Sequence, residues 1–140
     1  MRTRIEALKT AIEIKSAENS VAKEMKSFAA IQYILSKYGF VEFHRMADDG
    51  RGDDFIAFKR VGNVLLQQGF QQKARFTLDE KKYCGLGLLF CFMDGEELVV
   101  YDHDKLCNEY REYSDNNQID YKSRVMPKWA RENESTLILK

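Results

Sequence analysis

The chain has 140 residues, a formal net charge of zero, 44% hydrophobic residues and 31% charged residues. This length and composition are typical of one soluble globular domain with its own core, and the chain is too short for two ordinary domains. Zero net charge argues against a high-affinity, nonspecific nucleic-acid binder, because such proteins usually carry a basic excess.

The sequence also argues against a membrane protein and against a secreted one. It has no run of about 18 apolar residues, so we expect no membrane span. The N-terminal residues contain arginines but no apolar run behind them, so we expect no signal peptide. Its three cysteines, Cys84, Cys91 and Cys107, include no C-x-x-C pair. We therefore expect reduced cysteines in the core of a cytoplasmic protein, and no zinc site.

Two helices are expected before any strand. Residues 2–15 place Ile5, Leu8 and Ile12 on one helical face. After a polar break at 16–20, a second helix is expected from Ser20 as N-cap to residue 38, with Gly39 as its C-terminal stop.

The next segment has the alternation and turns of a sheet. Gly69 lies inside the longest expected strand and predicts a bulge or bend there. The expected elements are a strand over 40–46, a polar loop over 47–52, a strand over 55–60, a turn at 61–63 and a long strand over 64–76.

The second half is expected to continue the sheet and then return to helix. A capping box beginning at Thr77 predicts a helical turn over 78–83. The later elements are a buried strand over 86–93, a turn at 94–95, a strand over 97–101, a helix reaching Tyr113 and a loop at 114–117. Beyond that loop, Pro127 and Trp129 lie in a segment where the pattern does not distinguish helix from strand.

This order of elements predicts one α/β (α+β) domain over residues 1–140. It comprises a helical N-terminal part (1–38), a sheet core (40–101) and a helical or irregular C-terminal part (102–140). Helices on both sides of a central mixed sheet, in three α/β/α layers, fit this order best.

A chemically suggestive pattern lies between the strands over 55–60 and 64–76. Side chains alternate along a strand, so Gln71 and Lys73 should share one face and Gln72 should point to the other. If Asp54 lies on the neighbouring strand, its carboxylate can meet Gln71 and Lys73 in one pocket. Carboxylate and amide oxygens suit Mg²⁺, and an ammonium beside them can hold a phosphate or a water.

The segment from Gly52-Asp53-Asp54 to Phe70-Gln71-Gln72-Lys73-Ala74-Arg75 resembles the PD-(D/E)XK nuclease superfamily, which has the restriction-endonuclease-like fold. In this variant Gln71 replaces the second acid of the motif. The chain also has Gly52-Asp53 before the acid, where the family has proline. The resemblance implies a central sheet with helices packed on both sides.

The resemblance also implies a set of catalytic and metal-binding residues. Asp54, Gln71 and Lys73 would be catalytic, with Asp54 and Gln71 binding Mg²⁺ (or Mn²⁺). The backbone carbonyl of Gln72 would be a further ligand, and Glu24 would supply a second carboxylate from the preceding helix. Lys73 would position the attacking water and stabilise charge on the phosphate.

Each of these residues also has a structural interpretation. Gln71 and Lys73 could lie on a solvated strand face while Asp54 caps a turn, Asp53 competes with Asp54 for the acidic position, and Glu24 could face water. Three further cations, Arg75, Lys81 and Lys82, are expected to contact a nucleic-acid backbone, with ion pairs or a charged turn as their alternatives.

The two histidines are better explained by structure than by chemistry. Side chains of the adjacent residues Asp102, His103 and Asp104 diverge on any regular element, so a helix start explains both aspartates more simply than a metal site does. His44 lies on an expected strand, where a hydrogen-bonded structural role is favoured.

The expected function is a Mg²⁺-dependent nuclease that hydrolyses phosphodiester bonds in DNA, with a homodimer as the form that would cut both strands. The alternative is a catalytically inactive nuclease-fold domain that binds nucleic acid or a protein partner. A third hypothesis is an interaction module of unrelated α/β fold, which predicts that Asp54 and Lys73 lie far apart.

Overall fold

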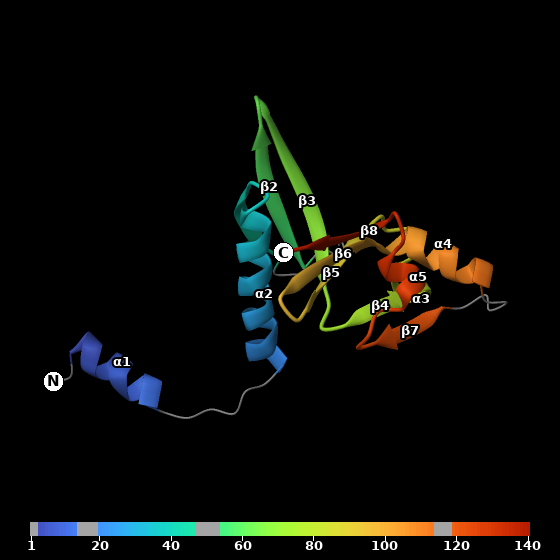
Figure 1. The fold of residues 1–140 in the computed structure, drawn as a ribbon. Coiled ribbons are helices and arrows are strands. Elements are labelled where there is room, and N and C mark those ends of the chain that lie inside the picture. The colour runs from blue at the N-terminus through green and yellow to red at the C-terminus, as the bar shows by residue number, and fades with distance from the viewer. Residues whose placement is uncertain (1–2, 14–19, 47–53, 114–118) are drawn as a thin grey trace.

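The structure is a computed structural model that describes residues 3–13, 20–46, 54–113 and 119–140 (Figure 1). Most helices and strands lie where the hydrophobic pattern predicts them. In chain order they are α1 (Arg4–Glu13), α2 (Ser20–Ser36), β1 (Phe40–Arg45), β2 (Phe55–Val61), β3 (Val64–Gln72), β4 (Phe76–Asp79), α3 (Glu80–Tyr83), β5 (Leu89–Asp94), β6 (Glu97–Asp102), α4 (His103–Tyr113), β7 (Asp120–Ser123), α5 (Lys128–Arg131) and β8 (Thr136–Leu139).

The main sheet is mixed. Its six strands lie in the order β1-β2-β3-β5-β6-β8, and β4 pairs with β7 in a separate two-stranded sheet. All pairings in the main sheet are antiparallel except that of β3 with β5, which is parallel and pairs Gln71 with Phe90 and Gln72 with Cys91. The chain is therefore a mixed α+β protein, as its sequence predicts.

Two apolar cores lie on opposite faces of this sheet. On one face α2 contributes Phe28 and Ile31, which pack in a cluster with Phe55 and Phe70. On the other face, Phe90 and Tyr101 lie in a cluster with buried residues of β4 and α4. The strand β6 alternates strictly between the two clusters, from Leu98 to Tyr101. Figure 1 shows α2 on one side of the main sheet and α3, α4 and α5 on the other, so the expected three layers are confirmed.

Both N-terminal helices form, with shorter bounds than expected. Helix α2 ends at Ser36, and Gly39 has φ +96°, a conformation that favours glycine and fits its expected role as the stop signal. Helix α1 has no buried residue. Its expected apolar face, Ile5, Leu8 and Ile12, is 54–72% exposed, so the pattern does not mark a core contact among the described residues.

The prediction of one long strand over 64–76 is wrong. Strand β3 ends at Gln72, and Phe76 begins β4 in the other sheet. A distant side chain stabilises the break, because the Tyr101 hydroxyl donates to the Thr77 carbonyl at 2.7 Å and accepts from the Thr77 N–H at 3.1 Å. The expected bulge at Gly69 is also wrong, since the β2–β3 register runs without a shift through the Ile56–Gly69 pair.

The start of α3 differs from the expected one, and the start of α4 agrees with it. Thr77 belongs to β4, and the cap of α3 is Asp79, whose carboxylate accepts from the Lys82 N–H at 3.1 Å. Asp102, one of the two aspartates expected at the start of α4, caps that helix by accepting from the Lys105 N–H at 3.2 Å. The segment that the sequence left undecided forms β7, α5 and β8, and β8 completes the main sheet beside β6.

The cysteines are free, and two of the three are buried. Cys91 and Cys107 lie in the core as expected, but Cys84 is exposed, so the prediction of three core cysteines is wrong for that residue. In the portions of the chain that the structure describes, no helix combines the length and the apolar character needed to cross a membrane. The loops expected at 47–52 and 114–117 lie outside the described residues.

Candidate functional site

Asp54 lies beside the end of β3. The β2–β3 register pairs Phe55 with Phe70, which places the residue before Phe55 next to the last residues of β3. The Asp54 N–H donates to the Phe70 carbonyl at 2.7 Å. Its Oδ2 accepts from the Gln72 N–H at 2.8 Å. The Asp54 carboxylate is thus within hydrogen-bonding distance of the backbone that lies between Gln71 and Lys73.

Gln71 and Gln72 point to opposite faces of the sheet. Gln72 pairs with Cys91 of the α2-side core, and its Nε2 donates to the Glu24 carbonyl of α2 at 3.1 Å. Gln71 pairs with Phe90, which belongs to the core under α4. Paired residues of neighbouring strands share a face, so the Gln71 side chain lies on the α4 side.

Lys73 is held on that same α4 side. Its Nζ donates to the Tyr83 hydroxyl at 2.8 Å and lies 4.6 Å from the centre of the Tyr83 ring and 5.7 Å from that of Phe90. An ammonium over aromatic rings is attracted to their negative faces. No sequence pattern indicates that Tyr83 fixes Lys73, because the two residues come from separate elements whose contact depends on the sheet topology.

Gln71 carries a buried oxygen that lacks a hydrogen-bond donor within the described part of the chain. The residue is 6% exposed, and its Oε1 has no partner there. Leaving a buried polar atom unsatisfied costs about 1–3 kcal/mol. A bound cation or a water molecule at this oxygen would remove that cost. Gln72 Oε1, on the opposite face, is also buried and also has no hydrogen-bond partner among the described residues.

The Gln72 carbonyl faces the same strand edge as Asp54. In an extended strand the N–H and C=O of one residue point to the same edge, and the Gln72 N–H points to the Asp54 carboxylate. The end of β3 therefore gathers a carboxylate, a backbone carbonyl and a buried amide oxygen. These are hard oxygen donors of the kind that Mg²⁺ prefers, so the residues present fit such an ion.

Glu24 borders this region but is engaged elsewhere. With Gln72 and Lys73 it lines a surface cavity of about 290 Å³. Its carboxylate lies 2.6 Å from the Arg45 guanidinium, and both side chains are more than 40% exposed. Within residues 3–13, 20–46, 54–113 and 119–140, no cluster of three or more His, Cys, Asp or Glu side chains could hold a metal ion. Asp53, the competing acid, lies outside the described residues.

The three expected nucleic-acid-binding cations are exposed but lie in two places. Lys81 and Lys82 lie on α3, where they line a surface concavity with Asp79 and Asp120. Arg75 lies in the turn between β3 and β4. Because β3 ends at Gln72, strand alternation does not extend to Arg75, so its two-residue spacing from Lys73 does not place both side chains on one face.

His103 is a structural residue. It is fully buried, its Nε2 accepts from the Asp79 N–H at 3.0 Å, and burial lowers the pKa of its imidazole. Asp104 accepts from the Gly85 and Gly87 N–H groups. Asp102, His103 and Asp104 accept from different backbone N–H groups, although Asp104 Oδ1 also lies 3.6 Å from His103 Nδ1.

His44 is also hydrogen-bonded, although at the surface. Its side chain is 56% exposed and its Nε2 lies 3.0 Å from Glu42 Oε1.

Comparison of the chain with protein-family models, with curated proteins and with solved structures gave no match. Its function is therefore inferred from the geometry and chemistry of the described residues.

Proposed function

We propose that the chain is a Mg²⁺- or Mn²⁺-dependent nuclease that hydrolyses phosphodiester bonds in DNA, built on a restriction-endonuclease-like fold. The observation that carries this proposal is the buried Gln71 Oε1, which has no hydrogen-bond partner among the described residues and lies next in sequence to the Asp54–Gln72 contact. That oxygen is on the same side of the sheet as the ammonium of Lys73. The arrangement speaks against the hypothesis of an unrelated module, which requires Asp54 and Lys73 to lie far apart.

Asp54, the Gln71 amide oxygen and the Gln72 carbonyl would hold the ion. A divalent ion bound there would polarise the phosphate and lower the pKa of a bound water. Asp54 keeps its orientation through the Gln72 N–H, so the carboxylate does not need to reorganise when the ion binds.

Lys73 would contribute positive charge on the substrate side. Its hydrogen bond to Tyr83 fixes the ammonium in a half-buried position. Fixed charges in partly desolvated sites stabilise developing charge better than mobile surface charges do. Lys73 can therefore donate a hydrogen bond to a phosphate oxygen or to the attacking water while Tyr83 limits its motion.

The second candidate is a catalytically inactive domain of the same fold that binds nucleic acid or a protein partner. Two observations favour it: Gln71 is an uncharged ligand, and the Glu24 carboxylate is paired with Arg45. Both weaken a metal site compared with one that has two unpaired carboxylates. In either case we propose a cytoplasmic location, and a homodimer is the form that would bring two sites to a DNA duplex.

The test is a cleavage assay on single- and double-stranded DNA and RNA with Mg²⁺, with Mn²⁺ and with EDTA. The variants are Asp54→Asn and Lys73→Ala, and the matched control is Lys128→Ala, whose side chain is 85% exposed on α5. Metal-dependent cleavage of DNA that disappears in both site variants and persists in the control would support the nuclease. If no substrate is cut, or if both site variants still cut, the inactive binding domain becomes the better proposal.

A further inference from the structure

A second basic site lies next to the proposed catalytic one. The antiparallel β4–β7 ladder pairs Phe76 with Ser123 and Thr77 with Lys122. Arg75 directly precedes β4 and Arg124 directly follows β7, so both arginines flank the same end of this ladder. They are 49 positions apart in sequence.

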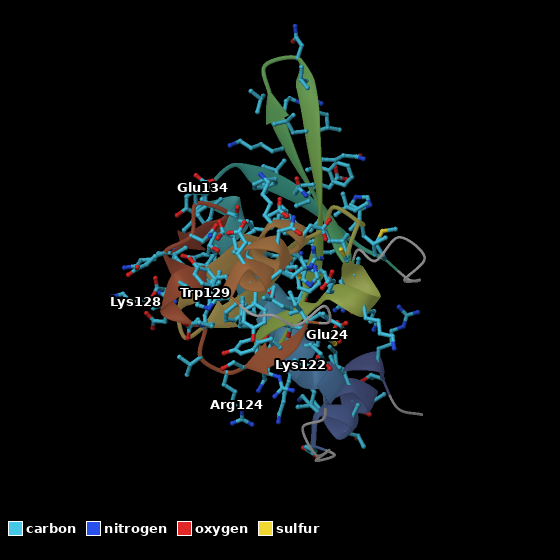
Figure 2. All side chains as sticks on the ribbon, turned by 90° about the vertical axis from the view of Figure 1, so that its right-hand side faces the viewer. Glu24, Lys122, Arg124, Lys128, Trp129 and Glu134 are labelled. Carbon is cyan, nitrogen blue, oxygen red and sulfur yellow. The ribbon has the colours of Figure 1, made fainter. Side chains whose placement is uncertain are left out.

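The two arginines line one surface concavity of about 510 Å³, whose other lining residues are Ala74, Phe92 and Met93. Both side chains are exposed, and neither guanidinium forms an ion pair or hydrogen bond with another described residue. Figure 2 shows Arg124 extending outward from the turn after β7. Its guanidinium is therefore accessible to a ligand from solvent.

The two arginines carry like charges into one concavity, and like charges close together repel each other. Many arginines of this chain are matched with acids, as Arg131 is with Asp94 and Glu97. An anion bound between Arg75 and Arg124 would remove the repulsion, and the planar guanidinium suits a phosphate because it can donate two parallel hydrogen bonds.

The concavity adjoins the proposed catalytic site. Ala74 lines both this concavity and the cavity bordered by Gln72, Lys73 and Glu24. A nucleic-acid strand whose scissile phosphate lies near Lys73 would therefore place a neighbouring phosphate near Arg75 and Arg124.

We propose that Arg75 and Arg124 form a phosphate clamp that holds the backbone of a nucleic-acid strand beside the catalytic site. The proposal rests on the proposed function for its ligand, and it adds Arg124, which no sequence motif indicates. The clamp contacts the phosphate backbone and not the bases. It therefore adds affinity and positions the strand, but it gives no preference for a base sequence.

The experiment measures binding of fluorescein-labelled single-stranded and duplex DNA by fluorescence anisotropy in EDTA, where no metal-dependent cleavage occurs. The proteins are wild type, Arg75→Ala, Arg124→Ala and the control Lys128→Ala. We expect each arginine variant to lose affinity about tenfold. The slope of log affinity against log salt should fall by about 0.7 per arginine on single strands or about 0.9 on duplex. The control should bind like wild type.

The charge reversal Arg124→Glu separates the clamp from a folding defect. It places a carboxylate in the same concavity as Arg75, so the variant should unfold at a higher temperature than wild type while binding DNA more weakly than Arg124→Ala. Failure of the wild type to bind DNA, or arginine variants that keep wild-type affinity and salt slope, would overturn the clamp. Because binding is measured without metal, loss of binding in the arginine variants supports the clamp even if no protein cleaves DNA.

Discussion

The Asp54 carboxylate accepts a hydrogen bond from the backbone N–H of Gln72 at 2.8 Å. This contact joins the residue just before β2 to the last residue of β3. Both lie beyond the Phe55–Phe70 pair, at which the β2–β3 ladder ends. Asp54 therefore stabilises a strand end in addition to any role as a metal ligand. The two roles can be separated, because asparagine keeps an acceptor oxygen for the Gln72 N–H but loses the charge that a metal ion requires.

Asp54→Asn should preserve the fold, and Asp54→Ala should weaken it. The alanine leaves the Gln72 N–H without this acceptor, so we expect the free energy of unfolding to fall by about 1–2 kcal/mol. The asparagine should stay within about 0.5 kcal/mol of wild type. Urea unfolding followed by circular dichroism measures both. Equal stabilities for the two variants would mean that the hydrogen bond contributes nothing.

Gln71→Glu should strengthen metal binding. The new carboxylate would replace the unpartnered amide oxygen with a charged ligand, so Mg²⁺ should raise the midpoint of thermal unfolding more than it does in wild type. Without metal the variant should be less stable by about 1–3 kcal/mol, since a buried carboxylate is poorly solvated. Thermal unfolding over a Mg²⁺ titration measures both effects.

Gln72→Glu is the matched control for that experiment. Gln72 is also buried, at 9% exposed, and its Oε1 likewise has no hydrogen-bond partner among the described residues, but its side chain reaches α2 on the opposite face. It should lose stability without gaining a response to Mg²⁺. A larger metal response in Gln72→Glu than in Gln71→Glu would place the ion on the α2 side and contradict the proposed ligand set.

Local signals account for the parts of the fold that the sequence predicts well. Gly39 ends α2, Gly62 with φ +59° makes the β2–β3 turn, and Asp102 caps α4. Each of these depends on residues within a few positions, so each can be recognised from a short window of sequence. The alternation that separates Gln71 from Gln72 is local in the same sense.

Long-range contacts account for what the sequence does not predict. The end of β3 is fixed by parallel pairing with β5 and by the Tyr101 hydroxyl at Thr77, which lies 24 residues away. The position of Lys73 depends on Tyr83. Arg124 lines one concavity with Arg75, beside a small sheet whose second strand could not be recognised from its pattern. These contacts join residues that are ten or more positions apart in sequence, so a short local pattern does not indicate them.

Tyr83→Phe should slow the reaction without unfolding the protein. It removes the hydroxyl that accepts from Lys73 Nζ and keeps the ring beneath the ammonium. A hydrogen bond of this kind is worth about 1 kcal/mol, so we expect kcat to fall about fivefold while the midpoint of urea unfolding changes little. Lys73→Ala, measured in parallel, should abolish cleavage. An unchanged kcat in Tyr83→Phe would show that the contact does not position Lys73 for catalysis.

Thiol labelling tests the burial of the cysteines. Burial raises the pKa of Cys107 to about 12 and that of Cys91 well above its ordinary value, so neither should form a reactive thiolate at neutral pH. A disulfide reagent should therefore modify Cys84 alone in the folded protein and all three cysteines after unfolding. Cys84→Ser should show no fast labelling. Rapid reaction of a second thiol in that variant would contradict the two-sided core.

The buried His103 predicts that stability falls in acid. Burial lowers its pKa below the ordinary value of 6.5, against the opposing effects of Asp104 and Asp79, and Lys73 lowers it further. The unfolded chain therefore binds a proton more readily than the folded one, so the stability that neutral His103 contributes is present above pH 6.5 and is lost as pH falls through the folded pKa. Urea unfolding between about pH 8 and about pH 5 measures this loss. His103→Gln, whose amide oxygen can accept from the Asp79 N–H, should flatten the profile; an equally steep acid loss in that variant would assign it to other groups.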